Sequence, residues 1–272
     1  MDSSQRYQNY ISLASTNDFG ALTAFYLSVF GGTKAEAEAY VKIALEAGKT
    51  YVYHISQSPA YIVSALTVIP AGNGCKYGAF GGTIPSLRCR GIFSDILNYV
   101  RNTEAKDSGL IFTNPSKKFA ELLEKRGFTH KAYALKCFLK GDLQSKTRFI
   151  HGTYGGATYY FLRQSTLGDD GISSDGFSLI YDYYLSRGNQ IARVAEGYLA
   201  FSVNDEEKGT YIIDECALNT SSILKLPPAF KACLVPETRE EELKKANIPY
   251  IRQCTAVADF NVNGRYINGL FK

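Results

Sequence analysis

The chain has 272 residues, 45% of them hydrophobic, with 30 basic and 26 acidic side chains and a net charge of +4. This length allows one large domain or two ordinary ones with a sizeable core. The charge is too small for the footprint of a nucleic-acid-binding domain, although it would help to attract an anionic cofactor. The amino terminus lacks the apolar core of a signal peptide, and the best apolar run, 61–71, is too short to span a bilayer. We therefore expect neither nucleic-acid nor membrane partners.

Six cysteines are present, and none form a Cys-x-x-Cys pair. Their spacing indicates neither a metal site nor a disulfide framework. Free thiols are typical of the reducing environment of the cytoplasm, which is the localisation we expect, with no bound metal.

The first half of the chain alternates between helical and strand patterns. Helices are predicted over 18–30 and from the capping-box signature Thr33-x-x-Glu36 to Ala47. There follow strands over 50–55, 61–69 and 76–84, a helix from Gly91, a strand over 110–113, a helix opened by Asn114-Pro115-Ser116 and stopped by Gly127, and a strand over 129–139. A strand–helix–strand step implies a right-handed crossover with parallel pairing, and it places the helix start at the carboxyl end of its strand, where open α/β sheets bind ligands.

The second half repeats part of this order. The patterns predict one long or bent strand over 148–163, a helix over 175–186, a hairpin of strands 191–203 and 210–218, a strand over 230–235, a charged helix over 237–246 and a strand over 249–260. The strand–helix–strand stretches that end near 139 and 260 lie 120 residues apart. We expect two halves, 1–143 and 144–272, that form a degenerate tandem repeat; chance similarity of two such pieces is the alternative.

The most informative stretch is 81–97, which predicts a strand, a tight basic turn and the start of an amphipathic helix. The first amide groups of a helix have no partner and carry partial positive charge, which favours a phosphate group. Gly91 lets an anion approach the backbone, and Arg88 and Arg90 add positive charge. An ordinary turn with two solvated arginines is the alternative. The second half has no counterpart of this turn, so we expect a single phosphate site.

The order of these motifs over residues 15–140 resembles that of GNAT-type N-acyltransferases. That family has a strand, the loop Arg/Gln-x-x-Gly-x-Gly/Ala, a helix, a strand and a helix that ends in Gly-Phe. Here the loop is residues 88–93, Arg-Cys-Arg-Gly-Ile-Phe, and the helix ends at Gly127-Phe128. The paired halves also resemble larger GNAT proteins with a degenerate second half. The resemblance implies an α/β fold with a mixed sheet.

The resemblance further implies an enzyme, an N-acetyltransferase that uses acetyl-coenzyme A. It would transfer the acyl group to a primary amine of a small molecule or peptide. Amides of the loop would hold the pyrophosphate, and the preceding strand would pair with the pantetheine arm. The residues that this resemblance assigns to cofactor binding are Gly82, Thr83, Ile84, Arg88, Cys89, Arg90, Gly91, Ile92, Phe93, Ser94, Asn114 and Ser116.

Departures from the family pattern concern mainly catalysis. Phe93 stands where the loop prefers Gly or Ala, and Leu123 replaces the Tyr that many members use to protonate the thiolate. The strand before the loop also lacks the Glu that often acts as general base. Tyr77 and His54 are the remaining candidates for acid or base; the alternatives are a cleft wall for Tyr77 and a packed or surface strand residue for His54.

Two other functions on the same fold remain open. The departures favour a non-catalytic acyl-coenzyme A-binding or regulatory protein. An aminoacyl-tRNA-dependent transferase is the other alternative, and the modest positive charge argues against it.

Overall fold

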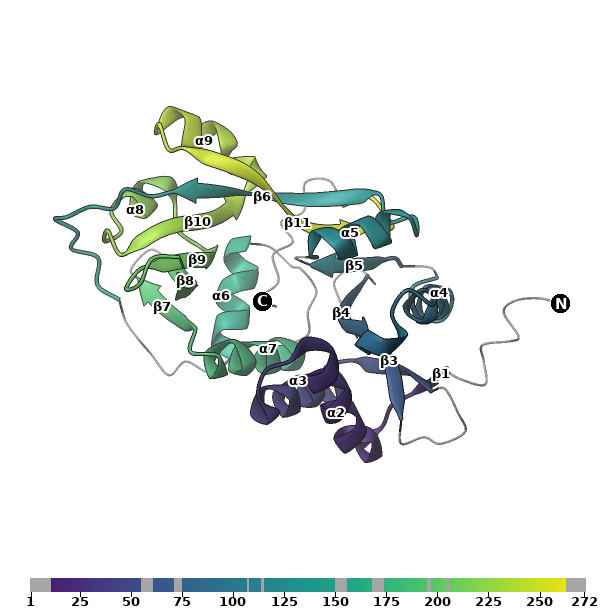
Figure 1. Ribbon diagram of the computed structural model, residues 1–272. Helices are drawn as coiled ribbons and strands as arrows, with labels where there is room; N and C mark the ends of the chain where they lie inside the picture. Colours follow the sequence, from purple (N-terminus) through teal and green to yellow (C-terminus); the bar gives the residue numbers. More distant parts are fainter. Residues whose placement is uncertain are drawn as a thin grey trace.

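The computed structural model describes residues 11–54, 61–70, 75–106, 108–113, 115–149, 156–167, 174–194, 197–204 and 206–262. The described strands form one mixed sheet of 11 strands in the order β1-β2-β3-β4-β5-β11-β6-β10-β9-β8-β7 (Figure 1). The expected α/β fold with a mixed sheet is therefore confirmed.

The first half folds largely as its local signals predict. Thr33 and Glu36 make both hydrogen bonds of the capping box, and Gly127 has the left-handed backbone that ends a helix, with φ of 89°. The short edge strand β1 is an addition to the predicted elements. The strands are β1 (Ile11–Leu13), β2 (Lys49–His54), β3 (Ile62–Pro70), β4 (Lys76–Thr83), β5 (Leu110–Thr113) and β6 (His130–Phe138), and the helices are α2 (Phe19–Phe30), α3 (Lys34–Glu46), α4 (Ile92–Thr103) and α5 (Lys117–Glu124).

The second half has the same kinds of element in a similar order. Its strands are β7 (Gln190–Val194), β8 (Gly197–Val203), β9 (Tyr211–Cys216), β10 (Phe230–Pro236) and β11 (Tyr250–Ala258), and its helices are α6 (Gly156–Leu167), α7 (Ser174–Ser186), α8 (Thr220–Leu224) and α9 (Glu240–Lys245).

The predicted strand over 148–163 is wrong, because residues from Gly156 onward form helix α6. Its aromatic and β-branched residues favour a strand by propensity. Their burial instead follows the helical period: Tyr159 and Arg163, four residues apart, are buried, whereas Phe161 between them is 67% exposed. Tertiary packing of one helix face therefore overrides local propensity here.

The single predicted strand over 191–203 is also wrong. The chain reverses between Val194 and Gly197, and the two parts pair as the antiparallel strands β7 and β8. Both strands have mainly buried residues. The hydrophobic pattern therefore continues through the reversal and could not show it.

The two halves exchange their last strands. β11 lies between β5 and β6 of the first half and pairs antiparallel with both. β6 in turn pairs antiparallel with β10 of the second half. β6 and β11 occupy equivalent places 120 residues apart, so their antiparallel pairing relates the halves by an approximate twofold axis. The boundary at 143/144 stays a prediction, and the sheet is continuous across it.

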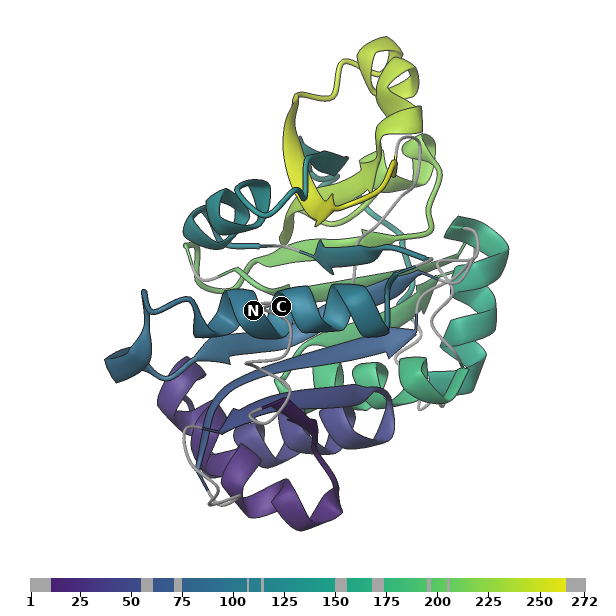
Figure 2. The same cartoon turned by 90° about the vertical axis from the view of Figure 1, so that its right-hand side faces the viewer.

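Helices cover both faces of the sheet (Figures 1 and 2). Residues of α3, α6 and α7 share one core with β4 and β5, and α2 packs on the same side against β2 and β3. α4 and α5 cover the other face of the first half, and α8 and α9 that of the second. Because α3 contacts α7, side chains of the second half come close to β4.

Candidate cofactor and acceptor site

The loop between β4 and α4 leaves the start of the helix open. Its backbone is left-handed at Cys89 and Gly91, with φ of 62° and 83°. The first hydrogen bond of α4 runs from the Asp95 N–H to the Gly91 carbonyl at 3.0 Å. The N–H groups of residues 92–94 therefore have no partner within the helix. A Cβ atom on Gly91 would meet nothing within 4 Å, so an anion has room to approach.

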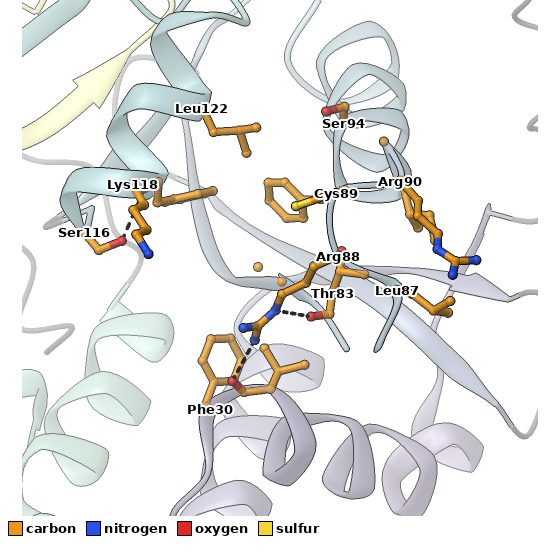
Figure 3. Close-up of a pocket in the computed structure, with 17 residues that line it drawn as sticks. Phe30, Thr83, Leu87, Arg88, Cys89, Arg90, Ser94, Ser116, Lys118 and Leu122 are labelled. Atoms are coloured by element: carbon orange, nitrogen blue, oxygen red, sulfur yellow. Dashed lines mark hydrogen bonds between the residues drawn. The ribbon is translucent and has the colours of Figure 1, made fainter. Parts of the chain in front are cut away.

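A cavity of about 560 Å³ lies at this end of the helix (Figure 3). The loop forms one wall, and the start of α5 with Ser116 and Lys118 forms another. The ends of β4 and α2 complete the lining. The structure here brings together the predicted cofactor residues Gly82, Thr83, Arg88, Cys89, Arg90, Gly91, Ile92, Phe93, Ser94 and Ser116.

Two predicted cofactor residues are not part of this lining. Ile84 is 7% exposed and belongs to the core between α2 and the sheet. Asn114 lies outside the described residues. Ser116 lines the cavity and also caps α5, because its Oγ accepts the Phe119 N–H at 3.3 Å.

Arg88 and Arg90 differ in what they contact. Arg88 donates from Nε to the Thr83 carbonyl at 3.1 Å and from Nη2 to the Val29 carbonyl at 3.5 Å. It therefore ties the loop to the ends of β4 and α2. The Arg90 side chain is exposed. It lies on the loop side of the cavity, opposite Lys118, and points away from Lys118 (Figure 3). Arg88 shapes the loop, whereas Arg90 and Lys118 are exposed basic residues on opposite walls of the cavity.

Sequence reasoning missed the contributions of α2 and most of those of α5. The signal for Lys118 was its place in the first turn of α5, two residues after the cap Ser116. The approach of α2 had no local signal because it depends on packing: a Cβ atom on Gly82 would lie 2.7 Å from Val29 Cγ1. The lining residues that were not predicted are Val29, Phe30, Leu87, Lys118, Phe119 and Leu122.

β4 and β5 separate next to this cavity. The two strands are parallel and pair through the first two residues of each, Lys76 with Leu110 and Tyr77 with Ile111. β4 then has a bulge, in which Phe80 and Gly81 lie opposite Leu66 and Phe80 has φ of 51°. The edge of β4 beyond Tyr77 therefore faces an open wedge.

A second cavity of about 230 Å³ lies in this wedge. It shares Phe30, Gly81, Ser116 and Phe119 with the first cavity, so the two adjoin. Its walls are mainly aromatic and come from both halves. The aromatic residues that line it are Phe30, Tyr40, Phe80, Phe112, Phe119 and Tyr183.

A hydrogen-bonded group from both halves closes the second cavity. The rings of Tyr40 on α3 and Tyr183 on α7 have centroids 4.7 Å apart. Arg187 Nη1 donates to the Tyr40 hydroxyl at 3.1 Å and to the Tyr183 hydroxyl at 3.0 Å. Burial raises the pKa of Tyr183 well above its usual value, so this hydroxyl stays protonated at neutral pH.

The two catalytic candidates, Tyr77 and His54, lie apart from both cavities. Tyr77 is 3% exposed within the core below α7. His54 ends β2, where its Nε2 lies 3.2 Å from Ser12 Oγ. Leu123 is the fully buried residue of α5, on the face that packs against the sheet. The described residues that line the two cavities include no Asp, Glu or His.

The described residues provide no metal site, no disulfide and no membrane-spanning helix. Within the described ranges, no group of three or more His, Cys, Asp or Glu side chains could hold a metal ion. None of the six cysteines, all of which are described, forms a disulfide. No described helix is both long and apolar enough to cross a membrane.

No family model and no curated protein matches the chain. Solved structures match its fold. A putative acetyltransferase from Pyrococcus horikoshii is 13% identical, with a TM-score of 0.59 over 96% of this chain and 92% of that one. A probable N-acyltransferase from Enterococcus faecalis is 13% identical, with a TM-score of 0.66 over 91% of this chain and 71% of that one.

A third match is described as a tandem protein. It is a tandem GNAT protein from the clavulanic acid biosynthesis pathway, 12% identical, with a TM-score of 0.52 over 91% of this chain and 97% of that one. At these identities the similarity shows the fold. The chain has the fold of the GNAT N-acetyltransferases, in the arrangement of tandem GNAT proteins.

Proposed function

We propose that the protein is an acyl-coenzyme A-dependent N-acyltransferase that transfers an acetyl group to a primary amine of a small molecule or peptide. The observation that carries this proposal is the open amino terminus of α4. It faces a cavity of about 560 Å³ that adjoins the wedge between β4 and β5. A candidate phosphate site and the wedge beside β4 therefore adjoin.

The residues of the site fit the parts of an acyl-coenzyme A. The amides of residues 92–94, with Arg90 and Lys118 nearby, suit a pyrophosphate. The edge of β4 beyond Tyr77 suits an extended arm that adds to the sheet by backbone hydrogen bonds. When bound, the cofactor supplies an activated thioester carbonyl.

The protein's own contribution is alignment and polarisation. In the bulge of β4, Phe80 and Gly81 lie opposite the single residue Leu66. We assign polarisation of the thioester carbonyl oxygen to a backbone N–H at this edge of β4. Holding an amine next to the thioester carbonyl makes its attack effectively intramolecular, which lowers the entropic part of the barrier. Because no described lining residue is Asp, Glu or His, we assign removal of the ammonium proton to solvent water. The neutral amine then forms the amide bond as the C–S bond breaks, and coenzyme A leaves as a thiolate that water protonates.

Thermal unfolding with acetyl-coenzyme A tests cofactor binding. A ligand at 100 times its Kd stabilises the folded state by about 2.7 kcal/mol, which for a chain of this size is a rise in Tm of about 5 °C or more. Arg90→Glu should reduce that rise. Arg193→Glu makes the same charge change at an exposed position of β7 and should not. Absence of any rise at millimolar ligand would refute the cofactor assignment.

A non-catalytic acyl-coenzyme A-binding protein is the second candidate function. It is favoured by Leu123, which is buried in the core and offers no hydroxyl group for the leaving thiolate. Release of free thiol from acetyl-coenzyme A across a panel of amines distinguishes the two candidates. Amine-dependent release supports transfer, whereas saturable binding without release for every amine supports the binding protein.

A further inference from the structure

The second cavity has the character of a specific binding site for an apolar group. We call Phe30, Tyr40, Phe80, Phe119 and Tyr183 the aromatic box; the five rings come from α2, α3, β4, α5 and α7. Within it, the centroid of Tyr40 lies 5.0 Å from that of Phe80 and 4.7 Å from that of Tyr183. These are contact distances for aromatic pairs, so the box has defined walls.

The floor of the wedge is too full for a long acyl chain. A Cβ atom on Gly78 would lie only 2.3 Å from Phe112 Cε1, so the Phe112 ring already packs on the backbone where β4 and β5 begin to separate. A short acyl group such as acetyl fits above this floor. The remaining part of the 230 Å³ cavity, toward Tyr40 and Tyr183, is then available to the acceptor.

The charge around the aromatic box favours one amino group on the acceptor over several. Aromatic faces attract an entering ammonium group. A second ammonium would find no carboxylate among the described lining residues and would meet Arg187 behind the two tyrosines. Glu36, an acidic group on which the charge of Arg187 acts, is exposed and accepts the Thr33 N–H at 2.7 Å. A polycation would therefore lose hydration without compensation.

On the basis of the proposed acyl transfer, we propose that the acceptor is a monoamine with an apolar, above all aromatic, carbon skeleton that the aromatic box binds. The second half of the chain thereby takes part in selecting the acceptor, through Tyr183 and through Arg187, which holds Tyr40 and Tyr183 in place.

The test compares 2-phenylethylamine, ethanolamine and spermidine as acceptors with acetyl-coenzyme A. We expect kcat/KM for 2-phenylethylamine to exceed that for each of the others at least tenfold. An equal or higher value for spermidine or ethanolamine would overturn the proposal.

Calorimetric titrations separate this inference from the proposed function. Acetyl-coenzyme A binding and thiol release report on the function itself. If no amine is acetylated, titration of 2-phenylethylamine and spermidine into the protein still tests the aromatic box. Tighter binding of 2-phenylethylamine supports the box, and tighter binding of spermidine or no binding of 2-phenylethylamine refutes it.

A matched pair of variants assigns the selectivity to the box. Tyr40→Leu should lower kcat/KM for 2-phenylethylamine at least tenfold and that for ethanolamine less than threefold, with an unchanged KM for acetyl-coenzyme A. Phe161→Leu, at an exposed aromatic position of α6 outside both cavities, should change none of these values. If Tyr40→Leu fails to fold, Phe30→Leu replaces it, because Phe30 is 49% exposed and its loss leaves no buried hole. Since Phe30 also lines the first cavity, the KM for acetyl-coenzyme A is then not used as a control, and only the ratio of kcat/KM for the two amines is compared with that of the parent protein. A loss that is the same for both amines would contradict the assignment.

Discussion

The two halves of the molecule share a strand–helix–strand framework but differ where the helix begins. In the first half, β4 leads into α4, which has 12 residues and starts at Gly91 without a side-chain cap. In the second, β9 leads into α8, which has five residues. There the Asn219 side chain accepts the Ser222 N–H at 2.8 Å. The second half thus closes its helix with its own side chain, whereas the first leaves the amides open to a ligand.

The strands before these helices, β4 and β9, also differ in whether side chains fill the space at their ends. In β9, Asp214 accepts the Tyr184 hydroxyl at 2.7 Å, and Glu215 forms an ion pair with Arg163 at 2.9 Å; the Tyr198 hydroxyl also donates to Glu215. The corresponding end of β4 has glycines and borders the cavities. On the proposed function, the open backbone at the end of β4 provides a binding site, whereas the buried side chains at the equivalent place in β9 provide structural support. We expect the predictions below to separate these two roles.

The largest expected effect is on stability and comes from the second half. Glu215→Ala leaves the Arg163 guanidinium buried without its carboxylate, which costs about 3–5 kcal/mol in the free energy of unfolding. Urea denaturation measures this loss. Glu207→Ala removes an exposed pair with Lys231 at 3.2 Å and should cost far less.

The same variant also tests the division of roles. Under conditions where Glu215→Ala is folded, its affinity for acetyl-coenzyme A should stay within threefold of that of the parent protein, since Glu215 does not line the first cavity, in which we place the cofactor. A much weaker affinity would show that the second half supports the cofactor site directly.

The next largest effect concerns the open helix end. Gly91→Asp places a carboxylate beside the amides of α4 and should weaken acetyl-coenzyme A binding about 100-fold, or about 2.7 kcal/mol. The control is Gly209→Asp in the second half, because Gly209 has a similar φ of 81° and equally open surroundings. Calorimetry should detect no change in affinity for the control. Equal losses in both variants would point to a general effect on folding.

A smaller effect is expected in the pH dependence of transfer. With no described Asp, Glu or His in the cavities, kcat/KM should rise tenfold per pH unit from pH 6.5 toward the pKa of the amine, about 10 for an alkylamine. Burial raises the pKa of Tyr183, so Tyr183 stays neutral over this range and Tyr183→Phe should keep the slope. A plateau near pH 7 in initial rates would instead reveal a general base in the protein.

The smallest expected effect compares the caps of α5 and α8. Ser116→Ala and Asn219→Ala each remove a side-chain acceptor at a helix start, at a cost of about 1 kcal/mol in stability. Because Ser116 also lines both cavities, only Ser116→Ala should in addition weaken acetyl-coenzyme A binding severalfold. Denaturation and calorimetry on both variants measure the two effects separately, and an equal loss of affinity would contradict the cavity assignment.

The loop at the cofactor cavity was largely predictable from sequence because its signals are local. A glycine at a left-handed position, the flanking arginines and the Ser116 cap all act within a few residues of the chain. The contributions of Val29 and Tyr183 were not predictable. They come from helices whose approach depends on how side chains far apart in sequence pack together.

The sequence by itself determined the helix and strand pattern of the first half and the open start of α4, since caps, glycines and hydrophobic period act locally. Only the tertiary structure decided that 156–167 is a helix, where burial of Tyr159 and Arg163 outweighs strand propensity. It also decided the exchange of β6 and β11, because strand order depends on long-range pairing that no local pattern encodes. The aromatic box arises from the same cause, since the packing of α3 on α7 brings Tyr40 and Tyr183 together.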